Sequence, residues 1–339
     1  LPCRTSRLLL APPGVPSEGF ILGRNGRREG ARKVALPDEA RLRHLLAEGQ
    51  TGTGKTTLMH GMIMQDIHAG RGLCLIDPHG DLVEQVMATM PEDRMADVAL
   101  LDPLDLQFPV GINPLDVKNP EEQDLVVEEF FTLFSRLWPA DFIGPVFQYN
   151  IRNTLLLMMH LARGGHIPSP ATVLALPRFI RDKSLVRNLK DKITDPVLRE
   201  YVEDTLEQSD FTRGEARGYL ISKFNVLLAH RAARLMVGQR QTRLDVGSLV
   251  EQGKIILVRI PSGELGEVTA RFLGFLVLLK VQSTIMARAA RPIEERTPFM
   301  LYVDEFQNFL TETLPILLAE GRKFGVGLTL ANQFLAQLR

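Results

Sequence analysis

The chain has no excess of charge of either sign. Its 339 residues include 40 Lys and Arg and 40 Asp and Glu, so the formal net charge is zero. A basic field over the whole molecule therefore cannot explain binding to nucleic acid, and any such binding must come from local clusters. The two cysteines, Cys3 and Cys74, are too few for a disulfide framework or a zinc site. Cys74 lies in an apolar run, which predicts a buried, unreactive thiol.

Long apolar runs are also missing. The longest, Phe272–Leu279, ends at Lys280 and is too short to span a bilayer, so no membrane-spanning segment is expected. The sequence shows no signal peptide, internal repeat or low-complexity segment. These absences predict a cytoplasmic protein. The first residue is Leu1 rather than Met, and a helical pattern runs from Phe334 to the last residue, so we expect a fragment of a longer protein.

One segment carries a clear chemical signal. Residues 49–56 read Gly-Gln-Thr-Gly-Thr-Gly-Lys-Thr and match the P-loop pattern G-x-x-x-x-G-K-[ST]. Glycines let backbone N–H groups cradle phosphates, the lysine reaches the β- and γ-phosphates, and the threonine hydroxyl binds Mg²⁺. A short apolar strand at 45–47 precedes the loop and a helix at 57–67 follows it, as the motif requires. The alternative is a glycine-rich turn without a ligand. The sequence predicts a site for ATP and Mg²⁺ formed by Gly49, Gln50, Thr51, Gly52, Thr53, Gly54, Lys55, Thr56 and Thr57.

A second apolar strand supplies the carboxylates that hydrolysis needs. Phe299–Val303 is followed directly by Asp304 and Glu305. We expect Asp304 to hold Mg²⁺ together with Thr56, and Glu305 to orient and deprotonate the attacking water. Both acids could instead cap the next helix.

Two further residues could have either a structural or a catalytic role. Gln333 ends the strand predicted at 328–333, where its amide could sense the γ-phosphate, but Asn332 and Gln333 are also ordinary turn formers. Arg322 ends a helix predicted at 316–322. It could act as an arginine finger on a neighbour's nucleotide, or only interact with the helix dipole together with Lys323.

The pattern of apolar residues changes twice along the chain. Residues 1–43 form a lead-in rich in Pro, Gly and Arg, with strand-like pieces at 21–25 and 33–36. Residues 44–113 and 246–339 alternate helices with continuous apolar strands, which is typical of a parallel sheet. The strands are expected at 72–76, 98–101, 254–260, 299–303 and 326–330. Residues 114–245 carry helical spacing only, over 121–137, 146–161, 169–179, 185–193, 196–207 and 215–228. The sequence predicts an α/β domain interrupted by an all-α domain.

Local charge clusters remain after the motifs are assigned. The helical region contains an arginine-rich stretch, and the lead-in contains a second one; either could bind a phosphate backbone or be a solvated surface. Their members are Arg213, Arg217, Lys223, Arg231, Arg234, Arg240 and Arg243, and Arg24, Arg27, Arg28, Arg32 and Lys33. Asp77, His79 and Asp81 follow another buried strand and could touch the outer shell of the metal or only order the turn.

Together these motifs resemble the HerA–FtsK superfamily of ring ATPases, and more narrowly the soluble ATPase part of type IV secretion coupling proteins. The segments that carry the resemblance are His44–Thr57, Cys74–Leu82, Ala99–Pro103, Gly253–Gly266, Leu301–Phe309 and Glu320–Leu338. The resemblance implies a RecA-like P-loop NTPase domain with an inserted all-α domain. It implies catalytic roles for Lys55, Glu305, Gln333 and Arg322, with Arg322 acting on the adjacent subunit and Gln333 sensing the γ-phosphate.

The function that this resemblance implies is ATP-driven DNA translocation by a homohexameric ring, in conjugative transfer. The resemblance implies three kinds of partner: DNA, a relaxase and secretion-channel proteins. It also implies that the protein is located at the inner face of the cell membrane. Many coupling proteins carry N-terminal membrane helices, which this sequence lacks, and the closing part of the ATPase domain is also expected to be missing. Three alternatives stay open: a HerA-like ATPase serving a nuclease in DNA repair or phage defence, a protein-secretion assembly ATPase that does not bind DNA, and a nucleotide-binding scaffold.

Overall fold

The computed structural model describes residue 12 and residues 14–25, 32–117, 120–207, 210–309 and 314–334. Cys3, Arg27, Arg28 and the helix expected beyond Phe334 lie outside these residues, as do the side chains of Arg213 and Arg217. The chain divides into two compact units. Residues 1–101, 246–259 and 281–339 form the sheet unit, and residues 102–245 and 260–280 form the helical unit. The domain boundaries predicted after residues 43, 113 and 245 stay predictions.

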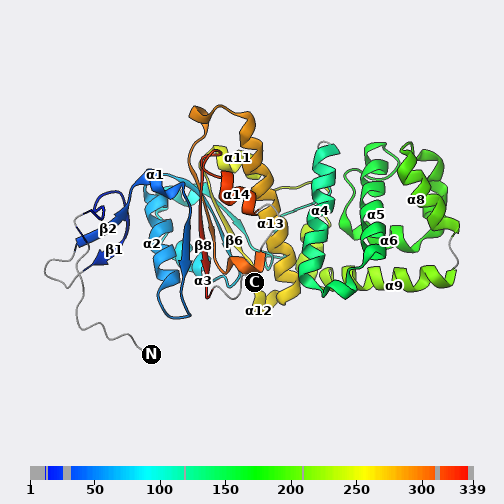
Figure 1. Cartoon of the computed structure of the whole chain (residues 1–339), viewed down its shortest axis with the longest axis horizontal. Helices are drawn as coiled ribbons and strands as arrows, with labels where there is room; N and C mark the ends of the chain where they lie inside the picture. Colours follow the sequence, from blue (N-terminus) through cyan, green and yellow to red (C-terminus); the bar gives the residue numbers. More distant parts are fainter. Residues whose placement is uncertain are drawn as a thin grey trace. The chain divides into compact units, whose positions relative to one another are not determined.

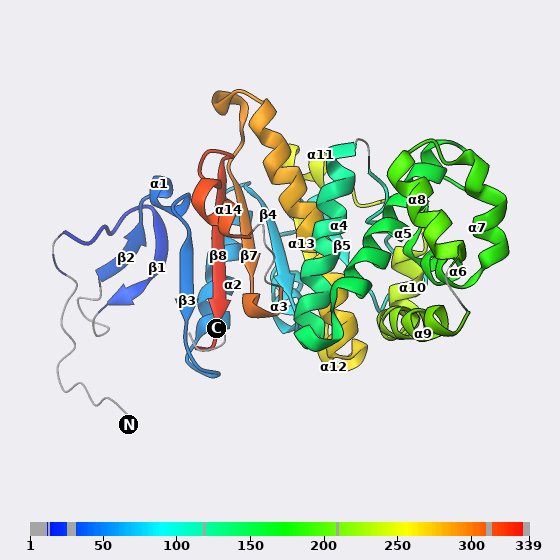
Figure 2. The same ribbon diagram turned by 45° about the vertical axis from the view of Figure 1, so that its right-hand side comes forward.

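The sheet unit is built on six parallel strands, as the continuous apolar runs predicted. Their order is β3 (Leu45–Glu48), β8 (Val326–Asn332), β7 (Phe299–Val303), β4 (Gly72–Asp77), β6 (Ile255–Arg259) and β5 (Val98–Leu101). Figure 2 shows β3 at one edge of this sheet with β8 beside it. Every residue of β4, β7 and β8 is buried, which explains why these strands show no polar alternation.

Helices cover both faces of this sheet. Its α-helices are α1 (Asp38–Arg41), α2 (Lys55–His68), α3 (Asp81–Ala88), α11 (Val246–Glu251) and α14 (Leu314–Glu320). Short 3-10 turns are η1 (Glu92–Asp97), η5 (Arg288–Ala290), η6 (Ile293–Glu295) and η7 (Phe306–Phe309). In Figures 1 and 2, α2 lies on one face of the sheet and α14 on the other. Met59, Ile63 and Ile67 of α2 are fully buried in the core, so they fix the helix that follows the P-loop.

The lead-in contains the strands that the sequence predicted. β1 (Phe20–Asn25) and β2 (Arg32–Leu36) form a two-stranded antiparallel sheet. The side chain of Gln65 on α2 bonds both the N–H and the C=O of Ile21, each at 2.8 Å, as a neighbouring strand would. The small sheet is thus attached to the P-loop helix.

The helical unit contains no strand among its described residues. Its helices are α4 (Pro120–Leu137), α5 (Pro145–Arg163), α6 (Leu176–Arg181), α7 (Lys183–Leu189), α8 (Pro196–Glu207), α9 (Asp210–Leu227), α10 (Arg231–Val237) and α12 (Ser262–Leu265), with 3-10 turns η2 (Ala140–Phe142), η3 (Val173–Ala175) and η4 (Lys190–Lys192). Figure 1 shows α9 running across the ends of α4 and α5. Phe134 of α4 packs its ring 5.0 Å from Phe147 of α5 and 5.1 Å from Phe224 of α9, which holds the three helices together.

The helical spacing of apolar residues from about 264 to 290 predicts one helix that does not span a membrane, and the structure differs from this prediction in two ways. Gly266 adopts a φ of +78° and separates α12 from α13 (Glu267–Ala287), which contributes residues to both units. The segment Glu267–Ala290 is also the one described helix long and apolar enough to cross a membrane, because a single Lys280 does not end it. Of its most apolar window, 61% is buried inside the protein, as in the core helix of a soluble protein. Length and composition therefore give only weak evidence for a membrane span.

Candidate nucleotide-binding site

The segments singled out by sequence follow neighbouring parallel strands. Gly49 follows β3, Gln333 follows β8, Asp304 follows β7, and Asp77 is the last residue of β4. Because the carboxyl ends of parallel strands share one edge of a sheet, these residues lie along that edge. Two backbone bonds tie the strand ends together: Gly49 N–H donates to the Asn332 carbonyl at 3.2 Å, and Asp304 N–H to the Ile76 carbonyl at 3.0 Å.

The P-loop has a backbone that only glycine adopts readily. Gly52 and Gly54 have φ values of +81° and +97°, in the left-handed region. The hydroxyl and N–H of Thr53 both donate to the Gln50 carbonyl, which closes the loop into a turn. No side chain among the described residues caps α2, so the first N–H groups of this helix remain for an anion. Thr51 to Gly54 are exposed, which leaves the loop open to a ligand.

The structure brings Lys55, Glu305 and Gln333 together. Lys55 Nζ lies 3.5 Å from Glu305 Oε1, and the two side chains are only 11% and 8% exposed. Gln333 Nε2 donates to the same oxygen at 3.1 Å, and Gln307 Nε2 donates to Glu305 Oε2 at 2.6 Å. Glu305 itself has a φ of +45°, which is unusual for a residue other than glycine. Its carboxylate is thus oriented by two amides and faces the P-loop lysine.

Carboxylate charge accumulates beside this cluster. Asp77 and Asp304 are 1% and 7% exposed. Burial first, and then the charge of Asp77, raise the pKa of Asp304 to about 6; the N–H of Glu305 and the charge of Lys55 only partly offset this rise. A divalent cation at this edge would relieve the repulsion between carboxylates.

The residues present fit Mg²⁺ and a nucleotide. Two buried amide oxygens at this edge, Asn332 Oδ1 and Gln307 Oε1, have no hydrogen-bond partner among the described residues and could accept from a bound ligand or its water. The described residues contain no group of three or more His, Cys, Asp or Glu placed to hold a metal. Mg²⁺ needs few protein ligands when phosphates and water complete its shell, so the two predicted ligands, Thr56 and Asp304, would be enough to hold it.

Gln307 has no role predicted from the sequence, and Asn332 is predicted only as a turn former. The available signal was position: both are amides next to the ends of β7 and β8. Asp77, by contrast, orders its turn. Its carboxylate accepts from the N–H groups of His79, Leu82 and Val83 at 2.9 to 3.1 Å, and so caps α3 after Gly80.

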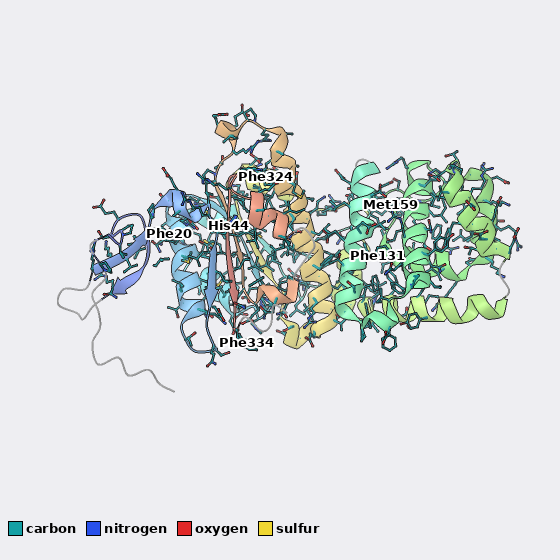
Figure 3. All side chains as sticks on the ribbon, viewed as in Figure 1. Phe20, His44, Phe131, Met159, Phe324 and Phe334 are labelled. Carbon is teal, nitrogen blue, oxygen red and sulfur yellow. The ribbon has the colours of Figure 1, made fainter. Side chains whose placement is uncertain are left out.

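Arg322 is not near these residues. It is exposed in the turn between α14 and β8, before the first residue of the strand, whereas Gln333 follows the last residue. The seven residues of β8 span about 20 Å at 3.3 Å per residue. Figure 3 shows His44 and Phe324 toward one end of the sheet and Phe334 at the other.

Comparison with known proteins gives matches at two levels. The family model described as "Type IV secretion-system coupling protein DNA-binding domain" matches residues 30–133, which include the P-loop and most of α4. No curated protein sequence matches the chain.

Solved structures match over most of the chain. TrwBdeltaN70, a bacterial conjugative coupling protein, has a TM-score of 0.60 at 18% identity over 90% of this chain and 65% of its own. TrwB in complex with ADP and Mg²⁺ has a TM-score of 0.58 at 18% identity over 90% and 67%. VirB4 of Thermoanaerobacter pseudethanolicus has a TM-score of 0.60 at 15% identity over 95% and 79%. The chain thus spans about two thirds of the TrwB structures.

These matches confirm the fold class predicted from the sequence, a RecA-like P-loop domain with an inserted all-α domain. They also agree with the motifs in pointing to one group of proteins. The chain resembles the coupling ATPases of type IV secretion, of the HerA–FtsK type, both in the segment matched by the family model and in its fold.

Proposed function

We propose that this chain is the ATPase part of a DNA-translocating ring, the coupling ATPase of conjugative transfer. The observation that carries the proposal is the buried contact between Lys55, on the P-loop, and Glu305, which Gln333 and Gln307 orient. The TrwB structures with ADP and Mg²⁺ and with a non-hydrolysable GTP analogue support nucleotide as the ligand. A homohexamer at the cytoplasmic side of the membrane, working with a relaxase and a secretion channel, completes the proposal.

The residues divide the chemistry between them. Gly49 to Thr57 bind the phosphates through backbone N–H groups, and Thr56 and Asp304 would hold Mg²⁺, which would neutralise charge on the phosphates. Lys55 binds the β- and γ-phosphates, and Glu305 then accepts a proton from the attacking water. Gln333 senses the γ-phosphate in this proposal, and its hydrogen bond to Glu305 supports that role. Arg322 of one subunit acts on the nucleotide of the next, because it lies at the opposite edge of its own sheet.

Substitution of the two central residues tests the chemistry. In the full-length protein, Lys55→Ala should weaken ATP binding. Glu305→Gln should bind ATP normally and lose turnover by about 10²-fold or more, because a general base is removed. Glu84→Gln is the matched control, since Glu84 is an exposed carboxylate on α3 paired with Arg259. Normal turnover by Glu305→Gln would show that Glu305 is not the base.

DNA dependence tests the motor. ATP hydrolysis should rise when single- or double-stranded DNA is added, and this rise should vanish in Glu305→Gln. If neither single- nor double-stranded DNA changes the rate of ATP hydrolysis, the result would instead favour a secretion ATPase that does not bind DNA.

A further inference from the structure

The turn that carries Arg322 is held by side chains from outside it. Arg296 donates to the Lys323 carbonyl, and Arg288 Nη1 donates to the Phe324 carbonyl at 3.0 Å. Arg288 is only 2% exposed and is fixed by Glu251. The backbone directly after Arg322 is thus fixed, while the Arg322 side chain is exposed.

His44 holds the other side of the same turn. A Cβ added to Gly321 would lie 2.9 Å from Cε1 and 3.3 Å from Nε2 of His44, so the ring packs directly on this glycine. The Leu328 N–H donates to His44 Nδ1 at 3.1 Å, and the ring also lies beside the backbone of Leu318. One imidazole therefore contacts α14, the Arg322 turn and β8 together.

The backbone of His44 is specialised for this contact. Its φ is +68°, a conformation that residues other than glycine rarely adopt. Its Nδ1 accepts a hydrogen bond, so the ring is neutral with its proton on Nε2. Partial burial lowers the pKa of His44, and the backbone of Leu318 only partly offsets this, so the neutral form is favoured at neutral pH. His44 directly precedes β3, the strand that leads into the P-loop.

We propose that His44 is a positioning residue for Arg322: it fixes the turn so that the guanidinium is presented to the neighbouring subunit. The inference rests on the proposed role of Arg322 in trans. If His44 acts only by positioning Arg322 of its own subunit, it contributes to catalysis in the neighbouring subunit's active site. His44 nevertheless lies next to β3, the strand that leads into the P-loop of its own subunit. His44 could therefore support catalysis in the neighbour's active site or in that of its own subunit. These two possibilities predict opposite results in mixed assemblies.

Three variants isolate the contact. His44→Gly removes the ring and suits the left-handed backbone. His44→Asn keeps an acceptor, because Asn Oδ1 can take the place of Nδ1, and Asn also tolerates this conformation. His68→Ala is the control, at an exposed position in the last turn of α2.

In the full-length protein we expect His44→Gly to bind ATP normally and to hydrolyse it about 10- to 100-fold more slowly, the effect of a misplaced catalytic group. His44→Asn should restore most of the rate, and His68→Ala should match the wild type. A wild-type rate for His44→Gly would overturn the proposal, as would equal losses in the Gly and Asn variants.

Mixed assemblies assign His44 to one site or the other. With co-assembly verified, His44→Gly mixed with Glu305→Gln should regain activity, because some interfaces pair an intact finger with an intact base. His44→Gly mixed with Arg322→Ala should not, because both lack a working finger. Recovery in the second mixture and none in the first would place His44 in its own subunit's site and overturn the inference. A wild-type rate for Arg322→Ala alone would instead refute the role of Arg322.

Discussion

Two buried ion pairs in the sheet unit differ in how completely they are satisfied. Arg41 and Asp66, 5% and 0% exposed, share Tyr302, whose hydroxyl donates to Asp66 at 2.6 Å and accepts from Arg41 at 3.0 Å. The Arg41 guanidinium also lies 3.7 Å from the centre of the Phe20 ring. Such a closed network stabilises the fold. Lys55 and Glu305, by contrast, lie beside carboxylate charge and beside amide oxygens that have no hydrogen-bond partner in the part of the chain that the structure describes, as expected of a ligand-binding site.

Removal of Asp66 should therefore be costly. Asp66→Ala leaves the Arg41 charge buried without its carboxylate, and we expect the free energy of unfolding to fall by about 3–5 kcal/mol. Asp38→Ala is the matched control: Asp38 pairs with Arg71, which also contacts Asp66, but its side chain is 61% exposed. That control should cost about 0–1 kcal/mol. Urea unfolding monitored by circular dichroism measures both, and equal effects would refute a structural role for the buried network.

At the scale of elements, the spacing between the strands β4 and β6 depends on a close contact between two glycines. A Cβ on Gly72, the first residue of β4, would lie 2.7 Å from the Gly253 Cα, just before β6. Gly72→Ala must separate two neighbouring central strands and should lower stability by about 1–3 kcal/mol. Gly61→Ala is the control, since Gly61 lies inside α2 with open space around it and alanine should stabilise that helix by up to about 1 kcal/mol. Thermal unfolding should thus shift in opposite directions, and a stabilising Gly72→Ala would contradict the packing argument.

The sequence predicted elements best where burial is continuous. Phe299–Val303 was predicted to the residue, because a strand buried on both faces is apolar throughout. The helix α10 was not predicted, because its arginines led this segment to be interpreted as a charge cluster. Ala233, Met236 and Val237 of α10 are nevertheless buried. The division at Gly266 was also missed, since both sides of it are apolar and helical.

The site was predictable where its parts follow motifs. Lys55, Asp304 and Glu305 could be expected at one edge because each follows or adjoins a strand of a parallel sheet. The contacts that hold the Arg322 turn could not be predicted from the sequence. Arg288 and Arg296 are 34 and 26 residues away from Arg322 (322 − 288 and 322 − 296), and only the fold brings them to this turn.

At the scale of the whole molecule, zero net charge means that the proposed DNA binding would have to come from local charge clusters. The arginine-rich stretch of the helical unit is not uniform. Arg234 donates to the carbonyls of Leu228 and Ala229, the two residues that follow α9, and Lys223 lies about 5 Å from the rings of Trp138, Phe142 and Tyr219. Arg231, Arg240 and Arg243 are exposed. These three are the better candidates to contact phosphates.

The salt dependence of DNA affinity should report those contacts. The logarithm of the binding constant falls linearly with the logarithm of salt concentration, with a slope of about −0.9 for each phosphate neutralised on duplex DNA. Replacing Arg231, Arg240 and Arg243 with Ser should flatten that slope by about 0.9 for each arginine that contacts a phosphate. Arg152→Ala is the control from the same unit, because Arg152 is already paired with Asp124 and Glu128. Fluorescence anisotropy with labelled DNA at several salt concentrations measures the slopes; an unchanged slope in the triple variant would exclude this surface as the DNA contact and leave the binding to other basic residues.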